Sequence, residues 1–459
     1  MEVEQVAMPV SASVLREAEQ IFEEVRDLRR ALHRHPECGL NLPLTQEAVL
    51  RRLAPMDALE LTAGSRLSSI TAVLRGQGPL PAGTRRPVVL LRADMDALPI
   101  IEDTGLEFSS ENVGVMHACG HDLHAAALVG AASVLHEHRR ELIADVVFMF
   151  QPAEETYFGA KYMIEEGVIE AAGRRADAAF GLHVQASDLP AGVFASRPGP
   201  LMAGCDELHA RVVGLGGHGS TPHVAKDPVP VVAEIVLALQ TLAARGYDPF
   251  DPVVITVGRI QAGSAGNVIP DFAEFDATVR MFSPQHRERL ISDIERICQG
   301  ITAAHGLSVE LSWAEPYPVT VADPGENEYA ASVVRGLLGA ESYQELKHPY
   351  SASEDFARVL REVPGTFLSL GARPIRDHPQ TAGLHSAQVT FDESVLPRAV
   401  ACLASLALNR EPVMLGEGED LRERSSPPEL EELHGDPGID ARYRGISQEL
   451  RGEPAFEGR

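Results

Sequence analysis

The stretch RPVVLLRAD, residues 86–94, is a short apolar run of valine and leucine that ends on an aspartate. A run of this length, bounded by a proline and by charge, is typical of a buried strand. An alanine-rich helical pattern at 124–142 follows it, and then a second apolar run, ADVVFMFQPAEE, at 144–155. Two buried strands joined through a helix predict a βαβ unit with parallel strands.

The same alternation of apolar runs and helical patterns extends through the first two hundred residues. Further runs occur at 160–172 and 176–184. Strands that alternate with helices are typical of an α/β fold with a mostly parallel sheet. We therefore predict an α/β domain whose first part covers residues 1–205.

The pattern changes from about residue 206. The runs predict, in order, a strand, a helix, two strands, a second helix and a closing strand near 307–313. This order indicates a separate α+β domain over residues 206–316. The signals of the first domain then resume over residues 317–410, which predicts that the second domain is inserted into the first.

Residues 411–459 are polar, rich in proline and glycine, and nearly free of apolar periodicity. Such a segment has too little apolar surface to bury for stable folding. We predict that it is a disordered acidic tail. The alternative is a tail that docks on a partner.

The composition limits the kinds of partner. The chain has 459 residues, 44% of them hydrophobic, and a formal net charge of −26. This charge would repel nucleic acid and anionic membrane surfaces, so we expect no nucleic acid and no membrane, and a partner that is a small molecule or a protein. Of these we predict a small-molecule substrate. No apolar run approaches the roughly 20 residues of a membrane span. The N-terminus does not resemble a signal peptide and the five cysteines are scattered, so we expect a cytoplasmic location.

Polar side chains occur at the ends of three predicted strands. Asp94 and Asp96 follow the first strand, Glu154 and Glu155 follow the second, and His183 ends the third. In open parallel sheets, sites form beyond the carboxyl ends of the strands. One such strand end is commonplace, but three indicate a shared site at one edge of the sheet.

The stretch MHACGHDLHAAALVG, residues 116–130, places Cys119 and His121 just ahead of a helical pattern. Residues two apart do not share a helix face, but they suit a loop that enters a helix near Asp122. Such a loop fits two ligands of one metal cluster. A thiol at a helix N-terminus beside a metal has a lowered pKa, which favours it as a ligand.

Two other interpretations of this stretch remain open. Cys119 could be a nucleophile, with His121 as its base and Asp122 as the orienting carboxylate. Alternatively the stretch is an ordinary helix start with two incidental histidines. We expect His124, and His136 further along the helix, on the helix surface. Neither interpretation gives a role to the adjacent glutamates after the second strand. In a metal site, one of them ligates the metal and the other stays free as general base.

Motifs spread along the chain resemble those of the M20 metallopeptidases, and within them the amidohydrolase branch of N-acyl-amino-acid amidohydrolases, hippurate hydrolases and plant auxin-conjugate hydrolases. The resemblance covers about residues 25–410. It implies a two-metal catalytic domain of the zinc-peptidase type, with an inserted lid or dimerisation domain of ferredoxin-like build. The motifs are RRALHRHPECGL (29–40), LRADMDALPI (91–100), MHACGHDLHAAALVGAA (116–132), FQPAEE (150–155), GLHV (181–184), GGHGSTPH (216–223), GSAGNVIPD (263–271), SEDFA (353–357) and GLHSAQVTFDE (383–393).

The resemblance also implies roles for individual residues. Glu154 would be the general base that takes a proton from the attacking water, and Cys119 would bridge two divalent metals. Asp96 resembles the carboxylate that orients a ligand. Asp94 stands where other M20 branches place a ligand histidine, and we do not count it as a ligand. The implied ligands are Cys119, His121, Glu155, His183 and His385.

Residues of the inserted domain complete the implied site. His218 matches the donor that stabilises the oxyanion, in its own subunit or in a partner's site. The alternative is a loop histidine with only a backbone role. Asn267 and Arg280 match positions that contact substrate, and Arg280 would suit a bidentate grip on an α-carboxylate or be an ordinary strand arginine. Ala387 departs from the branch, which usually has proline two residues after the ligand histidine.

We therefore predict a metal-dependent amidohydrolase that cleaves the amide bond of N-acyl-L-amino acids into a carboxylic acid and a free amino acid. The ligand set accepts Zn, Mn, Co or Ni. The resemblance further implies a homodimer formed through the inserted domain. The alternatives are a metallo-dipeptidase of the same fold, a non-catalytic metal-binding protein and a Cys-nucleophile hydrolase.

Overall fold

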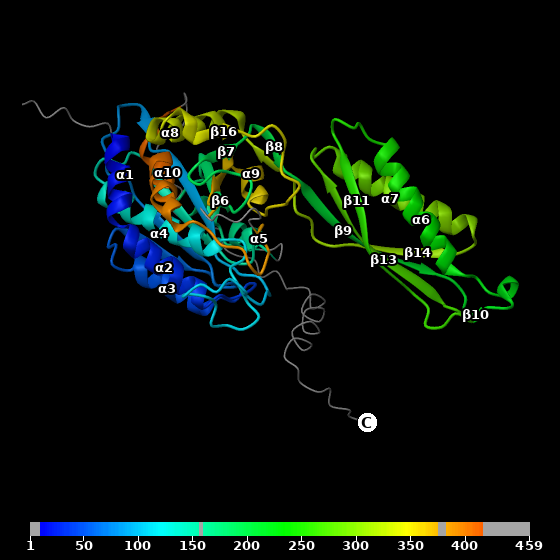
Figure 1. Cartoon of the computed structure of the whole chain (residues 1–459). Helices are drawn as coiled ribbons and strands as arrows, with labels where there is room; N and C mark the ends of the chain where they lie inside the picture. The colour runs from blue at the N-terminus through cyan, green and yellow to red at the C-terminus, as the bar shows by residue number, and fades with distance from the viewer. Residues whose placement is uncertain (1–9, 156–158, 375–381, 416–459) are drawn as a thin grey trace, which may run out of the picture. The chain divides into compact units, whose positions relative to one another are not determined.

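The computed structural model describes residues 10–155, 159–374 and 382–415 (Figure 1). An eight-stranded sheet forms the centre of the first domain. In spatial order its strands are β1 (Leu59–Ala63), β2 (Ile70–Leu74), β5 (Asp145–Gln151), β4 (Val88–Asp94), β6 (Ala178–Gln185), β17 (Gly365–Gly371), β7 (Phe194–Ser196) and β16 (Tyr343–Glu345). Strands β5, β4, β6 and β17 run parallel to one another, while β1, β2 and β7 pair antiparallel with a neighbour. The predicted α/β fold with a mostly parallel central sheet is confirmed.

Helices cover both faces of this sheet. The helices on one face are α1 (Val10–Gln20), α2 (Phe22–Arg34), α3 (Pro43–Leu53), α4 (His121–Glu137), α8 (Pro324–Leu338) and α10 (Leu396–Leu408). The other face packs against α5 (Gly159–Glu165), η1 (Val168–Glu170) and α9 (Ala357–Glu362). The parallel strands are therefore buried on both sides, which explains their continuous apolar sequences.

The alanine-rich pattern forms α4, which contacts α2, α10 and β4. Nearly all of its side chains are buried, because small alanines let neighbouring helices approach closely. At Gly130 a Cβ atom would lie 2.7 Å from Val400 of α10 and 2.9 Å from Val25 of α2. This close packing fixes α4, and with it the residues at its N-terminus.

A second, antiparallel sheet is inserted between β8 (Gly199–Met202) and β15 (Thr320–Ala322), which pair with each other and bring the two ends of the insert side by side. The strand order is β11-β13-β9-β14, and both helices of the insert share one core with the sheet (Figure 1). This βαββαβ order is ferredoxin-like, as predicted. The elements in chain order are β9 (Gly204–Val213), α6 (Pro228–Arg245), β11 (Val253–Ala262), β13 (Phe272–Met281), α7 (His286–Ala304) and β14 (Ser308–Trp313).

Helix α6 is, among the described helices, the one that is long and apolar enough to cross a membrane by length and composition. The core helix of a folded domain passes the same test. Val232, Ile235 and Leu239 of α6 are buried in the core of the insert, while Leu237 is exposed. The helix therefore packs on its own sheet through one face.

The chain continues in ordered structure a few residues beyond the predicted second part of the first domain. Val413–Met414 forms β18 and pairs antiparallel with β3 (Thr84–Arg85). The first residues of the predicted tail, 411–459, are thus part of the fold, and the tail beyond 415 lies outside the described residues. The predicted domain boundaries stay predictions.

Candidate metal centre

The carboxyl ends of β4, β5 and β6 meet at one edge of the central sheet, because these strands are parallel. Strand β4 ends at Asp94, and His183 lies near the end of β6. After β5 the chain turns through Ala153, whose φ of 59° is left-handed, before it reaches Glu154 and Glu155. The structure therefore brings the polar ends of all three strands to the same edge.

Two groups of ligand-type atoms share the thiol of Cys119. One group is Cys119, His121 and His183, the other is Cys119, Glu155 and His385, and within each group the atoms lie within 4.8 Å of one another. Cys119 Sγ is 3.3 Å from His183 Nε2, and His385 Nε2 is 3.3 Å from Glu155 Oε1. The structure thus unites all five implied ligands in one cluster, with the thiol common to both groups. Their role as ligands stays a prediction.

Two buried atoms of this cluster make no hydrogen bond among the described residues. They are Nε2 of His121, which lies 3.6 Å from Oδ2 of Asp94, and Oε1 of Glu155, which lies 3.3 Å from Nε2 of His385. Buried polar atoms without a hydrogen bond are rare in folded proteins. A thiol, three imidazoles and a carboxylate are also donors that divalent transition metals accept. The residues therefore fit a metal centre.

Asp96 connects the two glutamates with His121. Its carboxylate accepts hydrogen bonds from the backbone N–H groups of Glu154 and Glu155, each at 3.0 Å. Its Oδ1 lies 3.4 Å from Nδ1 of His121. Because Asp96 is buried, it holds the turn and the imidazole in a fixed relation. This geometry agrees with the orienting role implied by the resemblance.

Buried carboxylates make the cluster strongly negative. Burial disfavours the charged form of His121, but Asp94 and Asp96 outweigh it and raise its pKa to about 10. Burial and the charge of Glu155 raise the pKa of the Cys119 thiol well above its usual range. Such a thiol is a poor nucleophile, which argues against the Cys-nucleophile alternative. A cation bound beside the thiol would lower this pKa.

Glu154 lies between this cluster and a second set of carboxylates. Its carboxylate is within 4.8 Å of those of Glu354 and Asp355. Burial and the charge of Glu354 raise the pKa of Glu154 well above its usual range. A carboxylate with a raised pKa suits a general base near neutral pH. The backbone carbonyl of Glu154 also accepts a hydrogen bond from the Tyr317 hydroxyl at 2.6 Å, which connects the segment after β14 to this residue.

Arg92, which was not among the predicted site residues, organises the second set of carboxylates. Its guanidinium is fully buried and lies 2.7 Å from Asp94, 2.7 Å from Glu354 and 3.2 Å from Asp355. Gln151, at the end of β5, donates to Asp355 at 2.7 Å. The signal in the sequence was an arginine inside an apolar strand, because a buried arginine is rare unless it is paired.

His124 was predicted to lie on the helix surface, and this prediction is wrong. It is 2% exposed. Its Nδ1 lies 2.5 Å from Oδ1 of Asp94, and its Nε2 accepts a hydrogen bond from the backbone N–H of Val184 at 2.8 Å. The prediction was wrong because α4 is packed on nearly all sides and has no free face near its N-terminus. His136, near the C-terminal end of α4, is partly exposed as expected.

Besides Ala153, two residues beside the cluster have a left-handed backbone. Gly120 has a φ of 85°, and a Cβ atom there would lie 2.4 Å from Val184. Only glycine lets the turn between Cys119 and His121 pass this close to β6. His385 has a φ of 64°, and its backbone N–H donates to the carbonyl of Ala118 at 3.0 Å. Strain of this kind in a residue other than glycine is typical of functional sites.

The implied lid residues lie in two places. His218 is exposed on β10 (Gly217–His218), and the adjacent Gly219 N–H donates to the carbonyl of Asn267 at 2.8 Å, so His218 and Asn267 share one end of the insert. Within the described ranges no hydrogen bond or ion pair joins either residue to the cluster. Arg280 instead donates to the carbonyl of Ser351 at 2.8 Å, in the loop that leads to Glu354.

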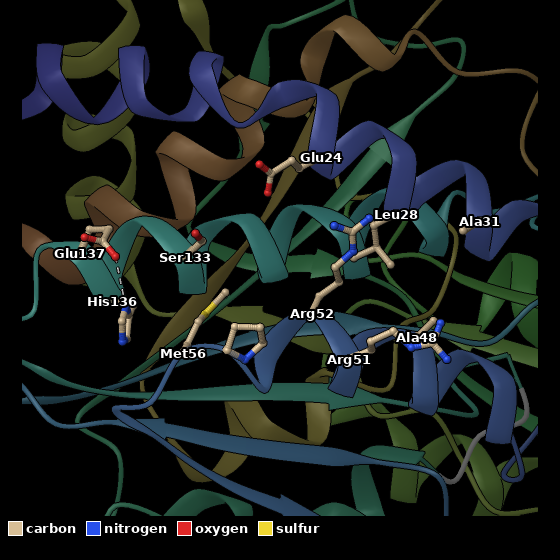
Figure 2. A pocket seen from close by; sticks show the side chains of 11 residues that line it. Glu24, Leu28, Ala31, Ala48, Arg51, Arg52, Met56, Ser133, His136 and Glu137 are labelled. Carbon is tan, nitrogen blue, oxygen red and sulfur yellow. Dashed lines mark hydrogen bonds and ion pairs between the residues drawn. The ribbon is translucent and has the colours of Figure 1, made fainter.

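A groove of about 560 Å³ lies elsewhere, between α2, α3 and α4 (Figure 2). Its walls combine apolar side chains such as Leu28 and Met56 with Arg51, Arg52 and Glu24. None of the implied site residues lines it. The groove is therefore separate from the cluster at the sheet edge.

Comparison with known proteins identifies the family. Residues 90–409 match the peptidase family M20/M25/M40. The chain is 35% identical over 382 residues to an N-acetylcysteine deacetylase of Bacillus subtilis, covering 83% of this chain and 95% of the relative. It is 37% identical over 391 residues to the IAA-amino acid hydrolase ILR1-like 2 of Arabidopsis thaliana, covering 85% of each.

A solved structure supports the same assignment. It is that of the YXEP protein of Bacillus subtilis, described as a dinuclear metal-binding peptidase of the M20 family. It is 33% identical to this chain with a TM-score of 0.71, covering 85% of this chain and 98% of YXEP. The chain therefore belongs to the peptidase family M20/M25/M40 and is a metal-dependent amidohydrolase of that family.

Proposed function

We propose that this chain hydrolyses the amide bond of N-acyl-L-amino acids to a carboxylic acid and a free amino acid. The observation that carries the proposal is the position of Glu154, a buried carboxylate beside five ligand-type side chains. The names of two relatives, an N-acetylcysteine deacetylase and an IAA-amino acid hydrolase, support this substrate class.

The proposed roles follow from where each side chain lies. Bound to the cluster, two divalent ions would supply Lewis-acid polarisation of the amide carbonyl. Glu154 takes a proton from the attacking water and returns it to the leaving amine. Asp96 keeps His121 and the turn that carries Glu154 aligned. The residues proposed to hold the ions are Cys119, His121, Glu155, His183 and His385.

Removing the metal tests this proposal. Dialysis against a chelator should abolish turnover of N-acyl amino acids, and adding back Zn²⁺, Mn²⁺, Co²⁺ or Ni²⁺ should restore it, because no other described group replaces the Lewis acid. A panel of N-acetyl, N-benzoyl, N-indoleacetyl and long-chain N-acyl amino acids, with unmodified dipeptides beside them, defines the substrate class. Faster turnover of the dipeptides would favour a metallo-dipeptidase. Turnover that survives complete metal removal would contradict the proposal.

We further propose a homodimer formed through the inserted domain, with His218 as the donor to the oxyanion. His218 is exposed, and its Nδ1 accepts a hydrogen bond from the backbone N–H of Ser220 at 3.1 Å. This leaves Nε2 protonated and available to donate. Asn267 and Arg280 are proposed to contact the substrate from the same domain.

Mixing two inactive variants tests whether His218 serves the partner's site. After subunit exchange between His218→Ala and Glu154→Gln chains, one site of each heterodimer would contain both intact groups. We expect partial recovery of activity if His218 acts across the interface. No recovery after exchange verified by mass spectrometry would place His218 in its own subunit's site or leave it without a catalytic role.

A further inference from the structure

The motif RRALHR, residues 29–34, carries part of the family resemblance but has no role in the proposed chemistry. It forms the second half of α2, and its first residue, Arg29, is only 1% exposed. An arginine this buried is rare unless its guanidinium is paired. The partners of Arg29 therefore indicate what the motif does.

Arg29 contacts two separate parts of the chain. Its Nε lies 2.8 Å from Oδ2 of Asp122, and its Nη1 donates to Oε1 of Glu393 at 3.1 Å. His33, one turn further along α2, places its Nδ1 2.8 Å from the same Oδ2 of Asp122. Arg30 donates to Glu393 through Nε at 3.1 Å and through Nη2 at 2.6 Å. Helix α2 thus holds both carboxylates at once.

Each of these carboxylates belongs to a segment that carries a proposed ligand. Asp122 directly follows His121 and is fully buried in the first turn of α4. Glu393 begins η4 (Glu393–Val395), which closes the loop that starts with His385. The side chain of His385 is 52% exposed, so its position depends on how this loop is anchored.

We propose that Arg29 is a positioning residue that fixes the helix of His121 and the loop of His385 relative to each other. His121 and His385 belong to different groups, and the two groups share only Cys119. The guanidinium of Arg29 lies between the two segments, so it sets the distance between the two halves of the centre. The inference rests on the proposed function, because it requires that these residues bind metal.

This role differs in its consequences from a purely structural ion pair. Residues that orient metal ligands without touching the metal change metal affinity by about 10–100-fold when they are substituted. Breaking any buried ion pair also destabilises the fold, so a lower Tm would not separate the two roles. The affinities for the two ions, measured one by one, distinguish the positioning role from the purely structural role.

Glu393→Gln and Arg29→Lys are the informative variants. Glu393→Gln releases only the His385 loop. We therefore expect it to lower the affinity for one of the two ions by about 10–100-fold and the affinity for the other by less than about threefold. Arg29→Lys keeps the positive charge but loses the planar guanidinium that can bond two carboxylates at once, so it should lower the affinity for both ions. Equilibrium dialysis of the full chain against Mn²⁺ measures the affinities. The thiolate absorption of the Co²⁺-loaded protein reports whether Cys119 remains bound.

Glu326→Gln is the matched control. Glu326 pairs with Arg410, and its side chain is 17% exposed, close to the 16% of Glu393. Because it lies in α8, outside both ligand segments, it should change the Tm without changing either affinity. Unchanged affinities in Glu393→Gln would overturn the inference, even if Arg29→Lys does not fold. If the unsubstituted chain binds no metal, the proposed function fails instead.

Discussion

Replacing Glu154 by glutamine is expected to remove most of the turnover while the protein keeps its metal. Glutamine has nearly the same size, but its amide cannot accept the proton of the attacking water. The kcat should therefore fall by about 10²–10⁴-fold, the range for a positioned general base. KM should change little, because the proposed substrate contacts are Asn267 and Arg280. Steady-state kinetics and metal analysis of the same purified protein measure both effects.

Glu155→Gln is the matched comparison, because the two glutamates are adjacent and chemically identical. Glu155 belongs to the group of ligand-type atoms with Cys119 and His385. Glu154 is not in that group and lies beside Glu354 instead. Glu155→Gln should therefore lower the metal content, and excess metal should restore part of its activity. If instead Glu154→Gln loses the metal and Glu155→Gln keeps it, the roles of the two residues are swapped.

The gathering of the cluster could be predicted from the sequence because it depends on local patterns. Each of three apolar runs ends on a polar residue, and parallel strands necessarily bring their carboxyl ends to one edge. Asp94, Glu155 and His183 could be placed in this way without knowledge of their contacts. The order of strands and helices in the insert could be predicted for the same reason, because hydrophobic periodicity within a short segment distinguishes a helix from a strand.

The surroundings of the cluster could not be predicted, because they depend on pairs far apart in the chain. Arg29 and Glu393 are separated by 364 positions, and Arg92 and Glu354 by 262. A single sequence shows that a buried arginine needs a partner but not which of many carboxylates provides it. His124 was misplaced for a related reason, since a nearly all-apolar helix does not reveal how many of its faces are covered.

The thiol of Cys119 is expected to decide the metal content of the whole centre. The thiol is common to two groups of ligand-type atoms. One group also contains His121 and His183, and the other also contains Glu155 and His385. Each group without it keeps two ligand atoms. We therefore expect Cys119→Ala to lower the occupancy of both ions and to reduce kcat by more than about 100-fold, beyond the 10–100-fold typical of residues that only orient ligands.

Cys38→Ala is the control for this experiment, because Cys38 is a free, exposed cysteine near the same carboxylates. Although the residue as a whole is exposed, partial burial of its thiol and the charge of Asp96 raise the pKa of Cys38 to about 12, yet Cys38 belongs to neither group of ligand-type atoms. Its removal should leave metal content and kcat nearly unchanged. Metal analysis by mass spectrometry, together with the Co²⁺–thiolate absorption, compares the two variants. Two ions per chain and near-normal turnover in Cys119→Ala would show that the thiol does not bridge the ions, and the cluster would then have to bind them through imidazole and carboxylate alone.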